Sequence, residues 1–409
     1  MFLRRMLKLN VKVRRNLLLI LVIIVNTYVW LICTSFVLGQ IIKMANLPNQ
    51  GLCIIWTTNF LGAAASIFLG AYLAGRIRNR RLFLFSWIIL GTVGSLASNF
   101  TTTFSFNEVL VVSILLNISF GFGLPVAMAE FSDNTAIECR AKLSGVVWFS
   151  VMLLSGLIMN FIGENLIINS LILTFWRTAS LAVLFFYETN INMAKNYASI
   201  IEVVKNRSFI LYLAPWTMFS LVNYLSVNVG INFFGEDFVS VLTLFSSFLA
   251  GVFAVFGGII SDTIGRRRTT ILGFVLLGFG YALLGIFPQN TATWYFYALI
   301  DGITWGIFYV IFLFTIWGEL AGHKSSENYY ALGSLPHLLS TYLRLIIGSI
   351  IAENVSFYAI FSLTAFFLFL AVIPLMFAPE TLPERVIRER ELRSYIERAK
   401  RVRERFTKG

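Results

Sequence analysis

The chain has 409 residues, of which 58% are apolar and only 13% charged, and its mean hydropathy is +0.80. Soluble domains carry about 25% charged residues, so this composition excludes an ordinary soluble protein and indicates one that lies in a membrane. The net charge of +12 does not indicate a nucleic-acid partner, because the basic residues form short clusters between long uncharged runs. Cys33, Cys53 and Cys139 lack the spacing of a metal site or a disulfide framework.

The apolar stretches predict twelve transmembrane helices, each close to the length of about 20 residues that a bilayer crossing needs. The first stretch is too long for the core of a signal peptide, and no small-residue cleavage site follows it, so we predict a retained helix. The fold class predicted is an all-α membrane protein. The predicted helices cover residues 17–42, 52–74, 82–100, 109–129, 143–163, 167–187, 209–232, 239–261, 269–287, 292–318, 331–351 and 355–378.

The basic residues predict the orientation of the chain. If both termini face the cytoplasm, 29 of the 32 Lys and Arg residues lie on that side. Lys43 then lies in an outer connector, and Arg177 and Arg344 lie within predicted helices. Cytoplasmic connectors of membrane proteins are enriched in Lys and Arg. We therefore expect a multi-pass protein of the plasma membrane with both termini in the cytoplasm.

An internal repeat of about 190 residues divides the helices into two sets of six, and parallel repeats of this kind are a known transporter plan. The expected units are a first half at 1–188, a linker at 189–207, a second half at 208–379 and a basic tail at 380–409, whose Glu and Arg spacing predicts a solvated or interfacial helix. The motifs that recur in order are basic clusters at 75–81 and 265–268, Glu130 with Glu138 and Glu319 with Glu327, and Tyr187-Glu188-Thr189 and Pro379-Glu380-Thr381.

The segment Gly258-Ile-Ile-Ser-Asp262-Thr-Ile-Gly265-Arg266-Arg267-Arg268 resembles the signature that follows helix 8 in the major facilitator superfamily. The resemblance implies two six-helix halves that rock about a central solute site, with this segment as a gating latch. The residues that we assign to the latch are Gly258, Asp262, Gly265, Arg266, Arg267, Glu130, Arg140 and Glu319.

The first-half copy of the latch motif departs from the family pattern. Gly75 stands where the family has aspartate, and Arg78 stands where it has glycine. This departure puts in doubt whether the first-half latch works in the usual way.

Three other segments resemble the sugar-porter and organic-ion-transporter branch of the superfamily. They are Gly121-Phe-Gly-Leu-Pro125 with the following Glu130 and Arg140, the stretch from Trp216 to Ser226, and Pro379-Glu380-Thr381. The short connector at 43–51 makes the chain more similar to prokaryotic members.

Arg344 and Asp301 are charged residues within predicted helices, where charge is costly and calls for a function or a partner. Arg344 lies about 20 Å from one edge of helix 11 and Asp301 about 13 Å from the opposite edge of helix 10, which places them at similar depth. They could form a structural ion pair. Alternatively, Arg344 faces the cavity and binds an anionic group, which the resemblance favours because organic-anion members carry an arginine in helix 11.

His337 and Arg177 each allow two interpretations. His337 shares a helix face with Arg344, which suits a solute or proton path, but a packed histidine bonded to a carbonyl is the commoner arrangement. Arg177 has no acid at its depth in the first half. It either lies near an interface because helix 6 is shifted, which we favour, or is an unpaired cation that faces the cavity.

The resemblance also implies that helices 1, 4, 7 and 10 line the cavity. Trp216, Asn223, Trp30 and Asn117 are therefore candidate solute contacts, although such residues more often serve helix packing.

Together these features predict a secondary active transporter that moves a small polar or organic solute by alternating access. Asp301 and His337 are the candidates for proton coupling. Two fixed cations against one acid would make the cavity positive and favour organic anions. A sugar porter, or a membrane sensor on the same fold that does not transport, are the alternatives.

The expected partners are the solute and the bilayer, with no nucleic acid, no cofactor and no metal, and the expected state is a monomer. Neither a phosphate-binding glycine-rich loop nor a nucleophile motif occurs, so we do not expect an enzyme.

Overall fold

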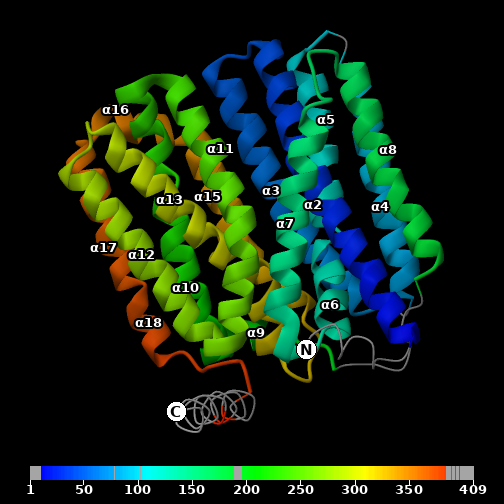
Figure 1. Ribbon diagram of the computed structural model, residues 1–409. Coiled ribbons are helices and arrows are strands. Elements are labelled where there is room, and N and C mark those ends of the chain that lie inside the picture. Colours follow the sequence, from blue (N-terminus) through cyan, green and yellow to red (C-terminus); the bar gives the residue numbers. More distant parts are fainter. Residues whose placement is uncertain are drawn as a thin grey trace, which may run out of the picture.

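The computed structural model describes residues 11–77, 79–101, 103–187 and 196–383, together with positions 388, 392 and 396. Two helical bundles lie side by side, one from each half of the chain (Figure 1). The first described helix begins, and the last one ends, at the same end of the bundles. Most of the predicted tail and the first part of the predicted linker fall outside the described residues.

The first half has six crossings, the fourth of which is interrupted. Gly123 begins the second part of this crossing so close to Trp87 that an added Cβ would overlap the indole ring, and Pro125 follows in the first turn, where proline is tolerated. The helices are α2 (Val11–Ala45), α3 (Asn49–Ala74), α4 (Arg80–Ala97), α5 (Phe106–Gly121) with α6 (Leu124–Asn134), α7 (Arg140–Met159) and α8 (Leu166–Phe185), with single 3-10 turns η1 (Ser98–Phe100) and η2 (Ile137–Cys139).

The second half repeats the plan after the short linker helix α9 (Ile200–Lys205). Its crossings contain breaks that the apolar pattern does not predict. The elements are α10 (Arg207–Val222), α11 (Leu225–Ile264), α12 (Arg266–Ile286), α13 (Thr291–Phe308) with the π-helix η3 (Tyr309–Thr315) and α14 (Ile316–Ala321), α15 (Glu327–Ile346) with α16 (Gly348–Asn354), and α17 (Phe357–Leu370) with α18 (Val372–Phe377).

The described helices account for twelve crossings. Ten stretches are long and apolar enough to span a membrane, and one of them, Arg207–Ile264, is 58 residues long. This stretch contains two crossings, because Gly235 has a φ of 82° and a ψ of 169° that turn the chain back inside α11. The remaining crossing is α15 with α16, which carries Glu327, His337 and Arg344. The predicted all-α fold of twelve helices in two halves is confirmed.

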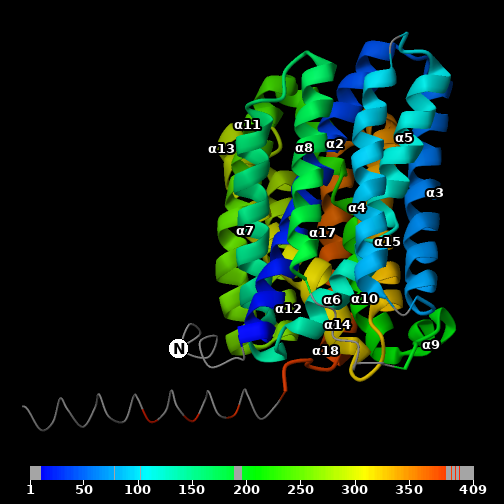
Figure 2. The same cartoon turned by 90° about the vertical axis from the view of Figure 1, so that its right-hand side faces the viewer.

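The two halves meet along α7 with α11 and along α3 with α15. Gly145 of α7 packs against the backbone of Ala254, and Gly258 of α11 packs against the backbone of Ala141. An added Cβ at either glycine would overlap a carbonyl oxygen of the other half, so two small residues allow the helices to approach closely. Figure 2 shows α7 and α11 running side by side along one edge of the molecule.

Candidate solute cavity and its closed end

A cavity of about 1630 Å³ lies between the halves. Its walls come from α2, α3, α5 and α7 on one side and from α11, α13 and α15 on the other. It extends from Lys43 and Glu164, at the end of the bundle opposite the basic connectors, inward to Trp317 and Tyr330. We call the end that carries the basic connectors 76–81, 140–142 and 266–268 the basic end. The cavity therefore opens away from the basic end.

Arg80, at the start of α4, joins the two halves at the basic end. Its guanidinium pairs with Glu130 at 2.9 Å and with Asp133 at 3.2 Å in its own half. It also pairs with Glu327 at the start of α15 in the other half. Tyr187 donates a further hydrogen bond to Glu130. Since the side chain of Glu327 is only 2% exposed, Arg80 neutralises a buried carboxylate across the interface between the halves.

The latch motif of the second half forms a second buried network. Arg266 pairs with Asp262 at 2.7 Å and with Glu319 at 2.9 Å, and all three side chains are at most 1% exposed. Asp262 also accepts the backbone N–H of Lys142 at 3.0 Å, and Arg266 donates to the carbonyl of Ile137 at 2.6 Å. Both of these last contacts cross between the halves, so this network also closes the basic end.

Glycine and the chain's C-terminal motif shape the turn between α11 and α12. Gly265 has a φ of 107°, which residues with a side chain rarely adopt. The carboxylate of Glu380 accepts the backbone N–H groups of Arg266 at 2.7 Å and Arg267 at 3.1 Å, and so caps the start of α12. Arg267 in turn donates to the carbonyl of Ala378 at 3.1 Å. Arg140 approaches Glu319 at 4.0 Å, so every residue assigned to the latch lies in these networks or beside them.

A side chain of the linker packs against Gly75, the position at which the family motif has aspartate. The ring of Tyr197 lies against Gly75, where an added Cβ would overlap it. Its hydroxyl accepts a hydrogen bond from Asn328 of α15 at 2.9 Å. The neighbouring ion pair between Glu202 and Lys324 is exposed, and its hydrogen bond lowers the pKa of Glu202 below the ordinary value. An aromatic side chain of the linker thus bridges α3 and α15 at this point.

Arg344 and Asp301 both line the cavity. At the open side, the helical segment of Arg344 ends at Asn354 and that of Asp301 begins at Thr291, so each charged residue lies ten residues from that end. The similar depth agrees with the prediction. No ion pair joins them in the described structure, where Arg344 is exposed to the cavity and has no hydrogen-bond partner. Asp301 instead accepts hydrogen bonds from Ser246 at 2.5 Å and Tyr297 at 3.4 Å. The structural ion pair is therefore not formed here.

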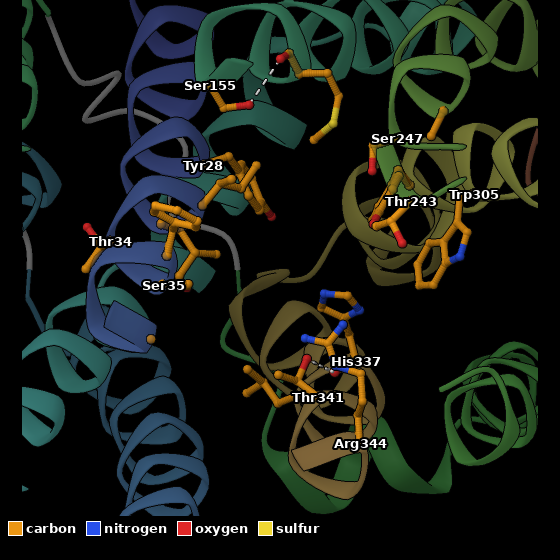
Figure 3. Close-up of a pocket in the computed structure, with 18 of the residues that line it drawn as sticks. Tyr28, Thr34, Ser35, Ser155, Thr243, Ser247, Trp305, His337, Thr341 and Arg344 are labelled. Carbon is orange, nitrogen blue, oxygen red and sulfur yellow. Dashed lines mark hydrogen bonds between the residues drawn. The ribbon is translucent and has the colours of Figure 1, made fainter. Parts of the chain in front are cut away.

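His337 lies in the cavity wall beside Arg344, and Figure 3 shows both side chains on one helix with Thr341, across from Trp305 and Thr243. The ring of His337 stacks on Trp216, with the centroids 6.2 Å apart, and among the described residues its nitrogens bond no carbonyl. Trp216 itself is fully buried behind the wall and donates to the carbonyl of Gly333 at 3.1 Å. Trp216 therefore supports His337 and does not line the cavity.

Arg177 occupies neither of the two predicted positions. Helix α8 coincides with the predicted helix 6, so Arg177 is near its middle, and the side chain is fully buried outside the cavity. The guanidinium carbon lies 4.5 Å from the ring centroid of Trp87 and 5.0 Å from that of Trp30, and a nitrogen donates to Thr27 at 2.8 Å. An aromatic cage takes the place of an acid. The prediction of two fixed cations in the cavity was therefore wrong.

The other predicted contacts Trp30, Asn117 and Asn223 all line the cavity. Each also holds a hydrogen bond within the protein. Trp30 donates to Ser95 at 2.7 Å, Asn117 to the carbonyl of Ser113 at 2.8 Å, and Asn223 to Ser340 at 3.1 Å. These side chains thus have part of their hydrogen-bonding capacity engaged before any solute arrives.

Several residues at the cavity and the basic end were missed by the sequence reasoning. Trp305 and Tyr309 line the cavity and follow Asp301 at intervals of four residues. Their spacing on the face of a charged residue was a usable signal. Tyr342 of α15 stacks on Phe60 of α3 in the cavity wall with centroids 5.1 Å apart, a pairing that no local pattern indicates. The role of Arg80 was hidden among four arginines in one short connector.

Comparison with known proteins agrees with this architecture. The family model described as Major Facilitator Superfamily matches residues 206–406, the half that carries the complete latch motif. A protein of Bacillus subtilis (strain 168), NiaP, which is named for niacin and nicotinamide transport, is 24% identical over 377 residues, or 83% of this chain and 88% of that one.

Solved structures share the fold. A proton:xylose symporter, XylE, bound to 6-bromo-6-deoxy-D-glucose has a TM-score of 0.65 at 14% identity, with 90% of this chain and 96% of that chain covered. The human organic anion transporter MFSD10 (TETRAN) also has a TM-score of 0.65 at 14% identity, over 90% and 100% of the two chains. The second half of the chain thus matches the family model, and the chain as a whole is a multi-pass membrane protein that shares the fold of these transporters.

Proposed function

We propose that this transporter carries a small aromatic organic acid as its anion, by alternating access, and that Arg344 binds the carboxylate. The observation that carries the proposal is the exposed guanidinium of Arg344, which faces the central cavity and pairs with no carboxylate among the residues that the structure describes. A guanidinium presents a planar fork of donors that matches a carboxylate, so an unpaired arginine in a cavity is suited to an anionic solute.

The rest of the cavity favours an aromatic solute. Trp305, Tyr309 and Tyr342 line the cavity together with Arg344, and aromatic rings stack readily on one another. Asp301 offers less opposition to an anion than a free carboxylate would, because two hydroxyl groups already donate to it. The relative named for niacin and nicotinamide transport supports an aromatic solute, since both compounds are small pyridine derivatives.

The conformation supports alternating access. The basic end is closed by ion pairs that join the halves, whereas the cavity opens at the other end. The distribution of basic residues favours a cytoplasmic basic end and a plasma-membrane location, so this arrangement corresponds to an outward-open state. We further propose that a proton is the coupling ion, with Asp301 and His337 as the candidate carriers.

The test compares nicotinate with its neutral isostere nicotinamide in proteoliposomes. Unlabelled nicotinate should compete with radiolabelled nicotinate uptake far better than nicotinamide does. Charged hydrogen bonds contribute about 1.5–3 kcal/mol, which corresponds to about 10- to 150-fold in affinity. Arg344→Ala should abolish this preference and most of the uptake, and Arg344→Lys should retain part of it. Arg207→Ala, at an exposed position of α10, is the matched control.

Three outcomes would contradict the proposal. Equal competition by nicotinamide would remove the role of the carboxylate. Indifference of anion uptake to Arg344→Ala, combined with competition by glucose or xylose, would favour a sugar porter. Saturable nicotinate binding without flux or counterflow would favour a sensor.

A further inference from the structure

A chain of hydroxyl groups leads from Asp301 to the break between α10 and α11, within the second half. The hydroxyl of Tyr297 lies 3.4 Å from the Asp301 carboxylate and 3.0 Å from the hydroxyl of Tyr281. Tyr281 lies 3.0 Å from the carbonyl oxygen of Asn223 and 3.2 Å from Ser226. Ser226 also lies 3.1 Å from Tyr297. The carboxylate is thus connected to Asn223 through two tyrosines, with Ser226 bridging between them.

Only the middle of the chain, Tyr281, is closed off from the cavity. Tyr281 is fully buried and does not line the cavity, whereas Asp301, Tyr297, Ser226 and Asn223 do. Asp301 carries the carboxylate of this chain, so a proton that enters from the cavity binds there. The groups behind it can respond only by changing which hydrogen bonds they donate.

The far end of the chain is a break in the helix. Asn223 follows the last residue of α10, and α11 begins only at Leu225, so Asn223 lies in the turn between them. Its side chain also donates to Ser340 of α15 at 3.1 Å. Ser340 is one helical turn from Arg344 on the same helix. The hydroxyl chain therefore ends where α10, α11 and the helix of Arg344 meet.

The hydroxyl groups can donate their hydrogen bonds in either of two directions along this series, because each hydroxyl group has a single proton to donate. With Asp301 charged, Tyr297 donates to the carboxylate, Tyr281 can donate to Tyr297, and the Asn223 carbonyl is left with the longer contact from Ser226 at 3.5 Å. With Asp301 protonated, the carboxyl donates to Tyr297, Tyr297 donates to Tyr281, and Tyr281 donates to Asn223 at 3.0 Å. The charge on Asp301 thus biases the hydrogen bond at the helix break, because an uncharged Asp301 leaves Tyr297 free to donate to Tyr281.

We propose that Asp301 is the proton-binding site of the transport cycle, and that Tyr297 and Tyr281 transmit its protonation to the break between α10 and α11. Protonation strengthens the hydrogen bond at the break, and the contact of Asn223 with Ser340 passes this change to the helix that carries Arg344. Deprotonation of Asp301 weakens the hydrogen bond at the break again. This inference rests on the proton coupling proposed above and specifies its site, and it does not depend on the identity of the cargo.

Few charged or titratable groups besides the tyrosines face Asp301. The side of α11 that contacts it contributes the Ser246 hydroxyl, and α11 has no charged residue between Asp237 and Asp262. Tyr281 comes from α12 and Tyr309 from η3. Across the cavity, α15 contributes His337 and Arg344. The ring stacking of His337 on Trp216 leaves it outside the hydroxyl chain, so the geometry favours Asp301 as the carrier.

Infrared difference spectra between acidic and alkaline buffer test the proton site without any solute. The reconstituted wild-type protein should show a protonated-carboxyl band that Asp301→Asn removes and Tyr297→Phe shifts. Tyr295→Phe, at an exposed position of α13, should leave the band unchanged. If Asp301→Asn leaves the spectrum intact over the pH range in which transport changes, the proposal is overturned.

Transport driven by a pH gradient tests the hydroxyl chain. With one proton carried per anion and a gradient of one pH unit, nicotinate inside wild-type vesicles should reach about ten times its outside concentration. The accumulation in protein-free vesicles is subtracted first. Asp301→Asn and Tyr281→Phe should both lose this accumulation, and Tyr281→Phe should continue to exchange nicotinate. Tyr295→Phe should accumulate like wild type.

The outcomes separate the two proposals. Wild-type accumulation by Tyr281→Phe would overturn the hydroxyl chain. Transport of nicotinate that ignores the pH gradient would overturn proton coupling and leave the role of Arg344 intact. Absence of nicotinate transport would overturn the cargo, and the infrared band would still decide whether Asp301 binds the proton.

Discussion

The ion pair between Arg80 and Glu327 provides a direct test of how the basic end is held closed. Glu327→Gln keeps the size of the side chain and removes its charge. Arg80 keeps Glu130 and Asp133 in its own half, so the loss falls on the contact between the halves. This contact must break when the basic end opens, and the variant should therefore shift the equilibrium toward that state.

The expected size of the shift in this equilibrium follows from the burial of the ion pair between Arg80 and Glu327. Glu327 is 2% exposed and Arg80 is 22% exposed, so the bond between them is charged and poorly screened by water. A hydrogen bond of this kind contributes about 1.5–3 kcal/mol. If the contact is present in one state only, the ratio of closed to open basic end should fall by about 10- to 150-fold.

Thiol labelling can measure this ratio in protein whose native cysteines have been replaced. Thr243→Cys lines the cavity and reports access from the open side, whereas Ser132→Cys is buried at the basic end and reports access from there. Glu327→Gln should slow labelling of the first reporter and accelerate labelling of the second. The exposed pair of Glu202 and Lys324 supplies the control, since exposed ion pairs contribute little, and Glu202→Gln should leave the ratio near wild type. An unchanged ratio in Glu327→Gln would refute the reasoning.

Three further variants test the packing. Arg177→Lys should lower the melting temperature in detergent, because contacts of a desolvated cation with aromatic rings contribute about 2 kcal/mol. Arg207→Lys is the control. A melting temperature of Arg177→Lys equal to that of the control would show that the aromatic cage contributes nothing. Gly258→Val should cost about 1–3 kcal/mol by overlap with Ala141, whereas Gly62→Val, with open space around it, should unfold like wild type in the same assay. Gly75→Asp should displace Tyr197 and speed the labelling of an Asn196→Cys reporter, and no acceleration would mean that the linker contact is dispensable.

The departure of the first-half motif shows how far a motif can be interpreted. Gly75 in place of aspartate left doubt about the first-half latch. The structure shows that the basic end is nevertheless joined on this side, by Arg80 to Glu327 and by Tyr197 to Asn328. Tyr197, Glu327 and Asn328 lie far from the motif in the chain, so only the folded protein brings them to it.

The sequence by itself determined the number of crossings, the repeat of six and the likeness of the second half to the major facilitator superfamily. The bilayer imposes these features locally, since each crossing needs its own run of apolar residues and the connectors carry the basic ones. It also indicated that Arg344 and Asp301 lie at similar depth, because depth along a helix is a matter of counting residues.

Only the tertiary structure decided which way each side chain faces. Helix rotation and the contacts between distant helices turned Arg344 toward the cavity, placed Trp216 behind the wall and enclosed Arg177 between Trp30 and Trp87. The break at Asn223 likewise depends on partners in α12 and α15. An apolar run satisfies the bilayer whichever face it turns toward the protein, so packing between helices determines the chemistry of the cavity.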